Sequence, residues 1–351
     1  MIRVAINGYG RIGRIAHRVI LQKHTQEIDV VAINAGSSTD IKGWMYLLKY
    51  DTSYGTLRDH TLELKSQNSN FKDSIGSLII DGKEIPVISQ KDPGLLPWRD
   101  LNVDVVIEST GHFTTAEKLK PHIDSGAKAV VLSAPVKGGE VPTYVISVNS
   151  NNYQGEKIIN NASCTTNCIT PVAKVMVDHF GVEKAMMTTI HGYTSDQRIQ
   201  DGGHKDYRRA RAAAENIIPT STGATIAATE AVPELKGLFN GLAIRVPVKV
   251  GSLSDFTFLL RRETTKEEVN NVLRESANNP AFKGILEVTE DPIVSSDIIG
   301  NPHSAIVDLS LTQVVGGNLV KIIAWYDNEY GYSSRLIEEV IMMGNRLNPN
   351  F

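Results

Sequence analysis

One of only two cysteines in the chain, Cys164, stands in a short polar run that could carry nucleophilic chemistry. Ser163 before it is a typical helix N-cap residue, and the apolar run 169–177 after it predicts the helix. Unpaired N–H groups and the dipole at a helix start favour an anion, so we expect this thiol to ionise more easily than a free one. Taken alone, the motif fits a small buried hydrophobe equally well, because unpaired cysteine usually belongs to a core.

Other residues in the same half of the chain could bind or activate a substrate. His191 directly follows an apolar run at 184–190 and is a candidate base, although a single histidine is more often structural. Arg245 lies within an apolar strand predicted at 242–250, where it needs a phosphate or a protein carboxylate as partner. The arginines at 208, 209 and 211 fit a solvated face or a subunit contact equally well. Thr220–Gly223 precedes a predicted helix. This segment could be a phosphate cradle, or it could simply be the N-cap of that helix.

The start of the chain has the pattern of a dinucleotide-binding unit. A turn with Gly8, Gly10 and Gly13 connects an apolar run at 2–6 to a helical pattern, and a second apolar run follows at 28–33. Glycines at these positions permit a tight turn and let the backbone approach a pyrophosphate at the helix N-terminus. A coincidental tight turn is the alternative, because the glycine spacing by itself is weak evidence.

The order of predicted elements changes near the middle of the chain. Further strands at 103–107 and 129–132 fit a parallel sheet, whereas longer β-rich stretches dominate the second half. We therefore expect an α/β protein with an N-terminal Rossmann-type parallel-sheet domain, and an α+β catalytic domain with a mixed or antiparallel sheet. The expected bounds are 1–163 for the dinucleotide domain, to which a C-terminal helix at 332–351 returns, and 164–331 for the catalytic domain.

The end of the second predicted strand lacks the acidic residue that usually binds the adenosine ribose of NAD. Ala35 lies there, and no carboxylate occurs before Asp40. A carboxylate would repel a ribose 2′-phosphate, whereas Ser37 and Ser38 can donate hydrogen bonds to it. The pattern favours tolerance of NADP or preference for it, and an NAD enzyme that binds the ribose through backbone groups is the alternative.

Composition limits the partners that we expect. The chain has 351 residues, is 41% hydrophobic, and carries 36 Lys and Arg against 39 Asp and Glu, a net charge of −3. We therefore expect no nucleic-acid partner. Two cysteines four positions apart do not make a disulfide framework, and no apolar run approaches membrane-spanning length. We expect a cytoplasmic protein with no membrane partner, and we assign no metal site.

Several motifs occur together: INGYGRIGR, ASCTTNC, HGYTSDQR, IIPTSTGA, the strand RVP and WYDNEYGYS. In this combination the chain resembles phosphorylating glyceraldehyde-3-phosphate dehydrogenase from end to end. The resemblance implies that Cys164 attacks the aldehyde of D-glyceraldehyde 3-phosphate and that His191 takes the proton and orients the substrate. Hydride then passes to nicotinamide, and inorganic phosphate cleaves the resulting thioester to 1,3-bisphosphoglycerate, a step of glycolysis and gluconeogenesis.

The resemblance also implies binding roles for particular residues. Thr194 and Arg245 match the site for the substrate's C3 phosphate, and Asn328 matches the residue that holds the nicotinamide carboxamide. The inorganic-phosphate site is matched by Ser163, Thr165, Arg209, Thr222 and Gly223. On the cofactor side, Arg11 and Ile12 match the pyrophosphate turn with its glycines Gly8, Gly10 and Gly13, and Ser133 matches a contact near the nicotinamide. Lys91 is a weaker match, since it stands where an arginine often touches the adenine side, and Ala35 replaces the usual acidic residue of this side.

Departures from the family pattern bear on cofactor choice and on the alternatives. Besides Ala35, the run Asp201–Gly203 stands where NAD-selective members often carry Leu-Pro, and both changes remove obstacles to a 2′-phosphate. We expect NADP and/or NAD as cofactor, and a homotetramer as in the family. The alternative enzyme is erythrose-4-phosphate dehydrogenase, which releases the acid by hydrolysis. A non-catalytic dinucleotide-binding or nucleic-acid-binding protein is disfavoured, because Cys164 and His191 are both present.

Overall fold

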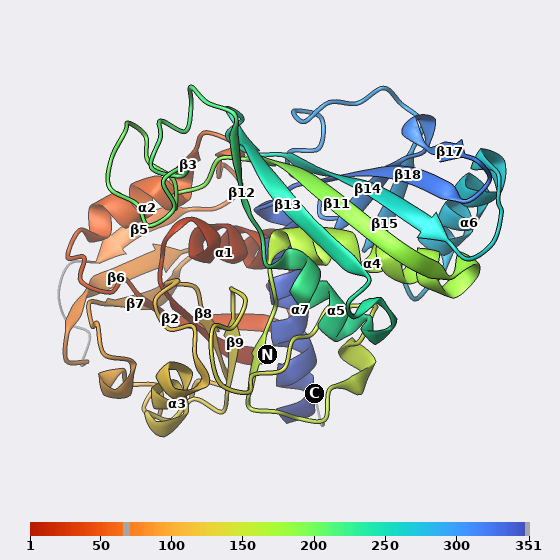
Figure 1. The fold of residues 1–351 in the computed structure, drawn as a ribbon. Helices are drawn as coiled ribbons and strands as arrows, with labels where there is room; N and C mark the ends of the chain where they lie inside the picture. The colour runs from red at the N-terminus through yellow and green to blue at the C-terminus, as the bar shows by residue number, and fades with distance from the viewer. Residues whose placement is uncertain (66–70, 348–351) are drawn as a thin grey trace. The chain divides into compact units, whose positions relative to one another are not determined.

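The computed structural model describes residues 1–65 and 71–347, and it divides into two compact units (Figure 1). The first unit contains Met1–Tyr144, Tyr153–Ala162 and the chain from Ser333 onward. The second contains Val145–Asn152 and Ser163–Tyr332. Residues 348–351 of the helix predicted at 332–351 lie outside the described residues. No described helix combines the length and the apolarity that a membrane span requires.

The first unit is built on a sheet whose central strands are parallel, as the sequence predicts for a Rossmann-type domain. The antiparallel edge of this sheet was not predicted. There, three consecutive strands at 62–65, 74–80 and 83–88 pair as an antiparallel meander. In order across the sheet, the strands are β10 (Ile158–Asn160), β9 (Ala129–Leu132), β8 (Val105–Glu108), β1 (Ile2–Asn7), β2 (Ile28–Asn34), β7 (Lys83–Ile88), β6 (Ser74–Ile80) and β5 (Leu62–Lys65). A short hairpin of β3 (Tyr50–Asp51) and β4 (Gly55–Thr56) lies apart from this sheet.

The helices of the first unit are α1 (Arg11–Lys23), α2 (Ile41–Lys49), α3 (Ala116–Asp124) and α7 (Tyr330–Leu347), which belongs to it from Ser333 onward. Helix α7 packs closely on β1, since a Cβ atom added to Gly344 would lie 2.4 Å from Cδ1 of Ile2. The inward face of α7 supplies buried Leu336, Ile337, Val340 and Met343. Helix α7 thus helps to bury the first strand.

The second unit contains a mixed sheet, in which parallel and antiparallel neighbours alternate irregularly. The predicted strand at 242–250 is observed three residues earlier and ends at Val246. Across the sheet the strands are β12 (Ile218–Ser221), β13 (Phe239–Val246), β11 (Val182–Gly192), β14 (Ser252–Leu260), β18 (Leu319–Tyr326), β16 (Ala305–Asp308) and β15 (Leu286–Thr289), and β17 (Gln313–Val315) pairs with β18. Single 3₁₀ turns lie at Pro93–Leu95 in the first unit and at Ser150–Asn152, Pro233–Leu235 and Leu309–Leu311 in the second.

Three helices cover one face of this sheet: α4 (Cys164–Phe180), α5 (Ala224–Ala231) and α6 (Lys266–Asn278). Their apolar side chains and the inward residues of β11, β14 and β18 form one buried cluster. The other face keeps large apolar side chains exposed, among them Met186 at 68% and Leu242 at 44%. Helix α4 is therefore a rigid core element, and the cysteine at its first residue is anchored by that core.

A buried carboxyl group on α7 predicts an unusual dependence of stability on pH. Glu339 is fully buried, its Oε2 has no hydrogen-bond partner, and burial, aided by the charge of Glu338, raises its pKa well above the usual value. The folded protein holds the proton more tightly than the unfolded chain does. The free energy of unfolding should therefore fall as pH rises from the unfolded-state pKa of about 4.3 towards the folded-state pKa.

We expect Glu339→Gln to remove this loss, because the amide cannot ionise. The variant should melt a few degrees above the parent protein at pH 8 and gain little at pH 4. Melting temperatures measured from pH 4 to pH 9 test this, with the exposed Glu290→Gln as control. An equal gain at both pH values would show that ionisation of Glu339 is not the cause.

Candidate active site

The glycine turn after β1 has the backbone geometry that a dinucleotide site requires. Gly8 has φ +95°, and a Cβ atom there would lie 2.6 Å from the backbone nitrogen of Thr110. A Cβ atom on Gly13 would lie 2.2 Å from the carbonyl oxygen of Gly8, whereas one on Gly10 would meet open space. Helix α1 begins at Arg11 without a side-chain N-cap. Glycine is therefore required at positions 8 and 13, and the space at Gly10 is open to a ligand.

A cavity of about 570 Å³ in the first unit opens over this turn. Gly8, Gly10, Ala35 and Lys91, all predicted to contact the cofactor, line it. Within the described ranges, no carboxylate lines this cavity. Other predicted cofactor residues, Arg11, Ile12, Gly13 and Ser133, do not line it, and the Arg11 guanidinium forms an ion pair with Asp51.

In the second unit, the structure brings the predicted nucleophile and base together. Sγ of Cys164, the first residue of α4, lies 3.3 Å from Nε2 of His191 near the end of β11. Ser163 caps α4 as predicted, since its Oγ accepts a hydrogen bond of 3.0 Å from the backbone N–H of Thr166. Residues 27 positions apart in the sequence thus meet at hydrogen-bond distance.

Neighbouring groups determine which nitrogen of His191 carries the proton. Nδ1 lies 2.6 Å from the carbonyl oxygen of Gly192, which can only accept, so we assign the hydrogen to Nδ1. The Arg245 Nη1, 2.9 Å from Nδ1, then donates to the same carbonyl oxygen (3.1 Å) and to Oγ1 of Thr194 (3.4 Å). This leaves the lone pair of Nε2 directed at the thiol. His191 is therefore arranged to accept a proton from Cys164.

Burial changes the acid–base behaviour of both groups. It lowers the pKa of His191 to about 3, helped by the positive charges of Arg245 and Arg209. Burial also raises the pKa of the Cys164 thiol, although the Arg245 charge and hydrogen bonds from Thr165 oppose this. Our expectation that the thiol ionises more easily than a free one was wrong for this state, because desolvation outweighs the helix N-terminus. Both directions favour the uncharged forms of the two side chains.

Arg245 has no carboxylate partner among the ion pairs of residues 1–65 and 71–347. It lies on β13 opposite His191, and its buried Nε has no hydrogen-bond partner. Gln197 points its amide at the same group of residues: Oε1 accepts from the backbone N–H of Thr194 (3.3 Å), and the buried Nε2 has no partner. A cation and an amide with unused N–H groups are chemically suited to bind an anion.

Two buried residues near the pair were not singled out in the sequence. The Tyr326 hydroxyl lies 2.9 Å from Oγ1 of Thr165 and 2.8 Å from Oγ1 of Thr189, and its ring packs edge-on against His191. Gln197 is the other. The alternation of inward residues along β18 could have identified Tyr326 as buried, but not its partners.

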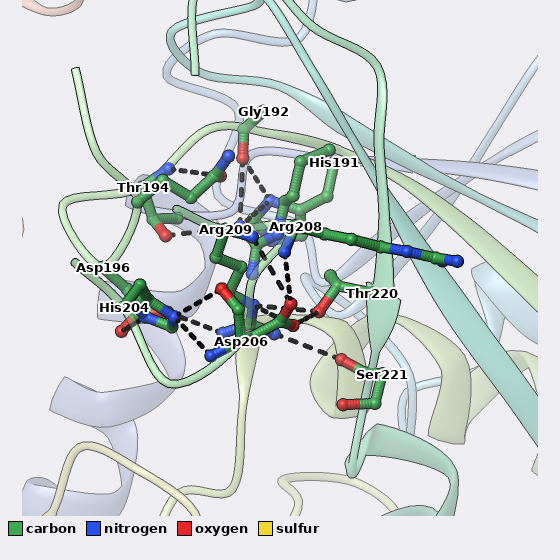
Figure 2. Close-up of polar contacts among 12 residues, drawn as sticks. His191, Gly192, Thr194, Asp196, His204, Asp206, Arg208, Arg209, Thr220 and Ser221 are labelled. Carbon is green, nitrogen blue, oxygen red and sulfur yellow. Dashed lines mark hydrogen bonds and ion pairs between the residues drawn. The ribbon is translucent and has the colours of Figure 1, made fainter. Parts of the chain in front are cut away.

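Arg209 lies in a separate polar cluster of the same unit (Figure 2). Its guanidinium bonds to Asp196, to Oγ1 of Thr220 and to the carbonyl oxygen of Ser221. Arg209 is near enough to His191 to influence its pKa. Helix α5 begins at Ala224 with Gly223 as N-cap, and Oγ1 of Thr222 accepts from the Ala224 N–H (3.2 Å).

Asn328, the residue expected to hold the carboxamide, is buried and fixed by its oxygen. Oδ1 accepts from the backbone N–H of Gly251 (3.0 Å) and from Oγ of Ser252 (3.2 Å). Ser252 also accepts a bond from the Gly192 N–H, so Asn328 is connected to the strand that carries His191. These hydrogen bonds of Asn328 use its oxygen and leave its amide nitrogen as an available donor.

A parallel-sheet unit with a dinucleotide turn and a unit with a paired thiol and imidazole are the parts of a nucleotide-dependent oxidoreductase. Comparisons with known proteins agree. Residues 2–116 match the family model of the glyceraldehyde 3-phosphate dehydrogenase NAD binding domain, and residues 163–328 match that of its C-terminal domain. The chain belongs to the glyceraldehyde-3-phosphate dehydrogenase family.

Named relatives cover nearly the whole chain. It is 49% identical over 348 residues to glyceraldehyde-3-phosphate dehydrogenase of Streptomyces coelicolor, covering 99% of each chain. It is 48% identical over 344 residues to that of Borreliella burgdorferi, covering 96% of this chain and 98% of the relative. It is 47% identical over 340 residues to glyceraldehyde-3-phosphate dehydrogenase 2 of Synechocystis, covering 96% and 97%.

Proposed function

We propose that the chain catalyses the NAD(P)-dependent oxidative phosphorylation of D-glyceraldehyde 3-phosphate to 1,3-bisphosphoglycerate. The 3.3 Å contact between Sγ of Cys164 and Nε2 of His191, in a chain of this family, carries the proposal. Steady-state rates with NAD and with NADP, each with and without inorganic phosphate, test it. The proposal requires a rate that depends on phosphate.

In the first step, the neutral His191 takes the thiol proton at Nε2 while Cys164 Sγ attacks the aldehyde carbon. Because Nδ1–H stays bonded to the Gly192 carbonyl, the ring keeps its orientation as it becomes a cation. Thr194, Arg245 and the free amide nitrogen of Gln197 bind the substrate's C3 phosphate. The product of the attack is a hemithioacetal on Cys164 in its alkoxide form, with the thiol proton held by His191.

A nicotinamide cofactor held by the first unit would supply the acceptor for the hydride of the hemithioacetal carbon. The residues present fit such a group: the turn at Gly8–Gly13 leaves room at Gly10, and α1 presents an uncapped N-terminus to a pyrophosphate. Asn328 would hold the carboxamide through its amide nitrogen. Loss of hydride leaves a thioester on Cys164.

Inorganic phosphate then attacks the thioester carbon, and the Cys164 sulfur leaves as 1,3-bisphosphoglycerate forms. We place this phosphate near Ser163, Thr165, Arg209, Thr222 and Gly223. The alternative, erythrose-4-phosphate dehydrogenase, would release the acid by hydrolysis, and its rate would not depend on phosphate.

For the cofactor, we propose that NADP is tolerated or preferred. Lys91, a cationic residue, lines the cavity over the glycine turn, as does Ser37. The carboxylate of Asp40, the next acidic side chain after Ala35, caps α2 by accepting from the Gly43 N–H (2.8 Å). A 2′-phosphate would therefore meet a cation and hydroxyl groups at the end of β2.

We expect Ala35→Asp to shift the ratio of kcat/KM values from NADP toward NAD by about 1–3 kcal/mol, through repulsion of the 2′-phosphate. Steady-state kinetics with both cofactors measure the shift. The neutral Ala35→Asn variant is the control and should shift the ratio much less. An unchanged kcat/KM for NADP in Ala35→Asp would show that this loop does not select the cofactor.

We expect Arg245→Ala to weaken transition-state binding of glyceraldehyde 3-phosphate by about 2–5 kcal/mol, because a buried cation that has no carboxylate partner is lost. Its KM for the phosphorylated aldehyde should rise far more than its KM for glyceraldehyde. Parallel steady-state kinetics with the two aldehydes, with Arg245→Lys as an intermediate case, measure the difference. Equal losses for both would indicate structural damage.

We also propose a cytoplasmic homotetramer. Both cysteines are free thiols, which suits a reducing compartment. The open face of the second sheet exposes the apolar side chains of Met186, Leu242 and Leu319. Contact with a second copy of the chain would bury these side chains. Light scattering coupled to size-exclusion chromatography tests the assembly, and a monomer would contradict it.

A further inference from the structure

Two carboxylates meet Arg209, and they are held in different ways (Figure 2). Oδ2 of Asp196 lies 2.6 Å from Nη1 of Arg209, whereas Oδ2 of Asp206 lies 3.6 Å from Nε. The other guanidinium contacts do not involve a charge: Nε donates to Oγ1 of Thr220 (3.0 Å) and Nη2 donates to the Ser221 carbonyl oxygen (3.2 Å). Two neutral acceptors therefore fix the plane of the guanidinium independently of Asp196.

Asp206 builds the loop on which Arg209 lies. Oδ2 accepts a bond of 2.6 Å from the Thr220 hydroxyl, and Oδ1 accepts from the backbone N–H groups of Arg208 (2.9 Å) and Arg209 (3.4 Å). The same Thr220 hydroxyl oxygen accepts from Arg209, so Asp206 orients the group that orients the arginine. Its hydrogen bonds, that from Thr220 above all, keep its pKa below the usual value.

Asp196 has no such structural task in the described part of the chain. It is half exposed, and its carboxylate bonds only to the two side chains Arg209 and His204, the latter at 3.5 Å. Burial alone would raise its pKa, but Arg209 outweighs this and holds the pKa low, so Asp196 carries a negative charge. Part of Arg209's capacity to bind an anion is already used by the protein itself.

We propose that Asp196 is an internal competitor for the acceptor phosphate: it neutralises Arg209 in the free protein and gives up Nη1 when inorganic phosphate binds. The inference rests on the proposed function, in which Arg209 belongs to the inorganic-phosphate site. Asp206 has the opposite role and is a positioning residue for Arg209. A phosphate oxygen replaces Asp196 at Nη1, while Thr220 and Ser221 keep the guanidinium in place. The protein therefore binds phosphate more weakly than the same cluster would without the carboxylate of Asp196.

The test compares two isosteric variants, each of which neutralises one of the two carboxylates that contact Arg209. Asp196→Asn should lower the KM for inorganic phosphate about three- to tenfold, since the pair is partly exposed and only modestly strong. Asp206→Asn should raise that KM, because an amide nitrogen would face the donors that now bond to the carboxylate. The KM for the aldehyde should change little in either variant. The control Glu290→Gln, which breaks an exposed pair with Arg274 in the same unit, should leave the phosphate KM unchanged.

Two further measurements strengthen the test. Sulfate, used as a competitive inhibitor against phosphate, should bind Asp196→Asn more tightly by the same factor. The difference between the parent protein and Asp196→Asn should shrink as the concentration of an inert salt rises. A raised or unchanged phosphate KM in Asp196→Asn would overturn this inference but not the proposed function. A parent rate that does not depend on phosphate would overturn the proposed function and this inference with it.

Discussion

The Cys164→Ser variant should lose at least about 10⁴-fold in kcat for aldehyde oxidation, because the hydroxyl that replaces the thiol is a far weaker nucleophile and leaving group. The expected loss exceeds that of any other single substitution considered. Absorbance of the reduced cofactor at saturating substrate measures it. Near-normal turnover would refute the assignment of Cys164 as the nucleophile.

The second cysteine provides a matched control. Cys168 lies one turn further along α4, is fully buried, and has its Sγ 3.9 Å from Oγ of Ser254. Cys168→Ser places a hydroxyl in the core, so it should lower the melting temperature while retaining most activity per folded molecule. Comparable loss of turnover in both variants would point to damage of α4.

We expect His191→Asn to reduce kcat about 10²- to 10⁴-fold near neutral pH, through loss of the base. In the parent protein, the pKa of His191 is lowered to about 3, so the imidazole is a neutral acceptor throughout the neutral range. In the variant the thiol, whose pKa is raised by burial, must ionise unaided. The rate of the variant should therefore climb about tenfold per pH unit over the range in which the parent rate is flat.

Rates of thiol alkylation by iodoacetamide, measured over the same pH range, give an independent reading of the ionisation. The variant should react more slowly at neutral pH and approach the parent protein as pH rises. If the pH profiles of the two proteins ran parallel, Nε2 of His191 would not be the group that takes the thiol proton.

Several parts of the site were predictable because local chemistry determines them. Ser163 caps the helix that starts at Cys164, and the carboxyl end of an apolar strand placed His191 where ligand-facing residues occur. The spacing of Gly8, Gly10 and Gly13 identified the turn, and steric contacts in the structure explain why two of them cannot carry a side chain.

Other parts depend on contacts that no local pattern encodes. The hydroxyls of Thr165 and Tyr326 meet although they are 161 positions apart. The sequence predicts that Arg245 needs an anion, but only the coordinates show that the described ion pairs do not include it. The direction of the pKa shift of Cys164 was mispredicted, because burial is a tertiary property and it exceeds the local effect of the helix start.

The most direct test of the central claim is to trap the acyl group on the protein. The parent protein is mixed with glyceraldehyde 3-phosphate and oxidised cofactor in phosphate-free buffer, quenched in acid, digested and examined by mass spectrometry. We predict a 3-phosphoglyceroyl thioester on the peptide that contains Cys164. This acyl group should be lost when inorganic phosphate is added before quenching. Acylation of a different residue, or cofactor reduction with Cys164 unmodified throughout, would contradict the account.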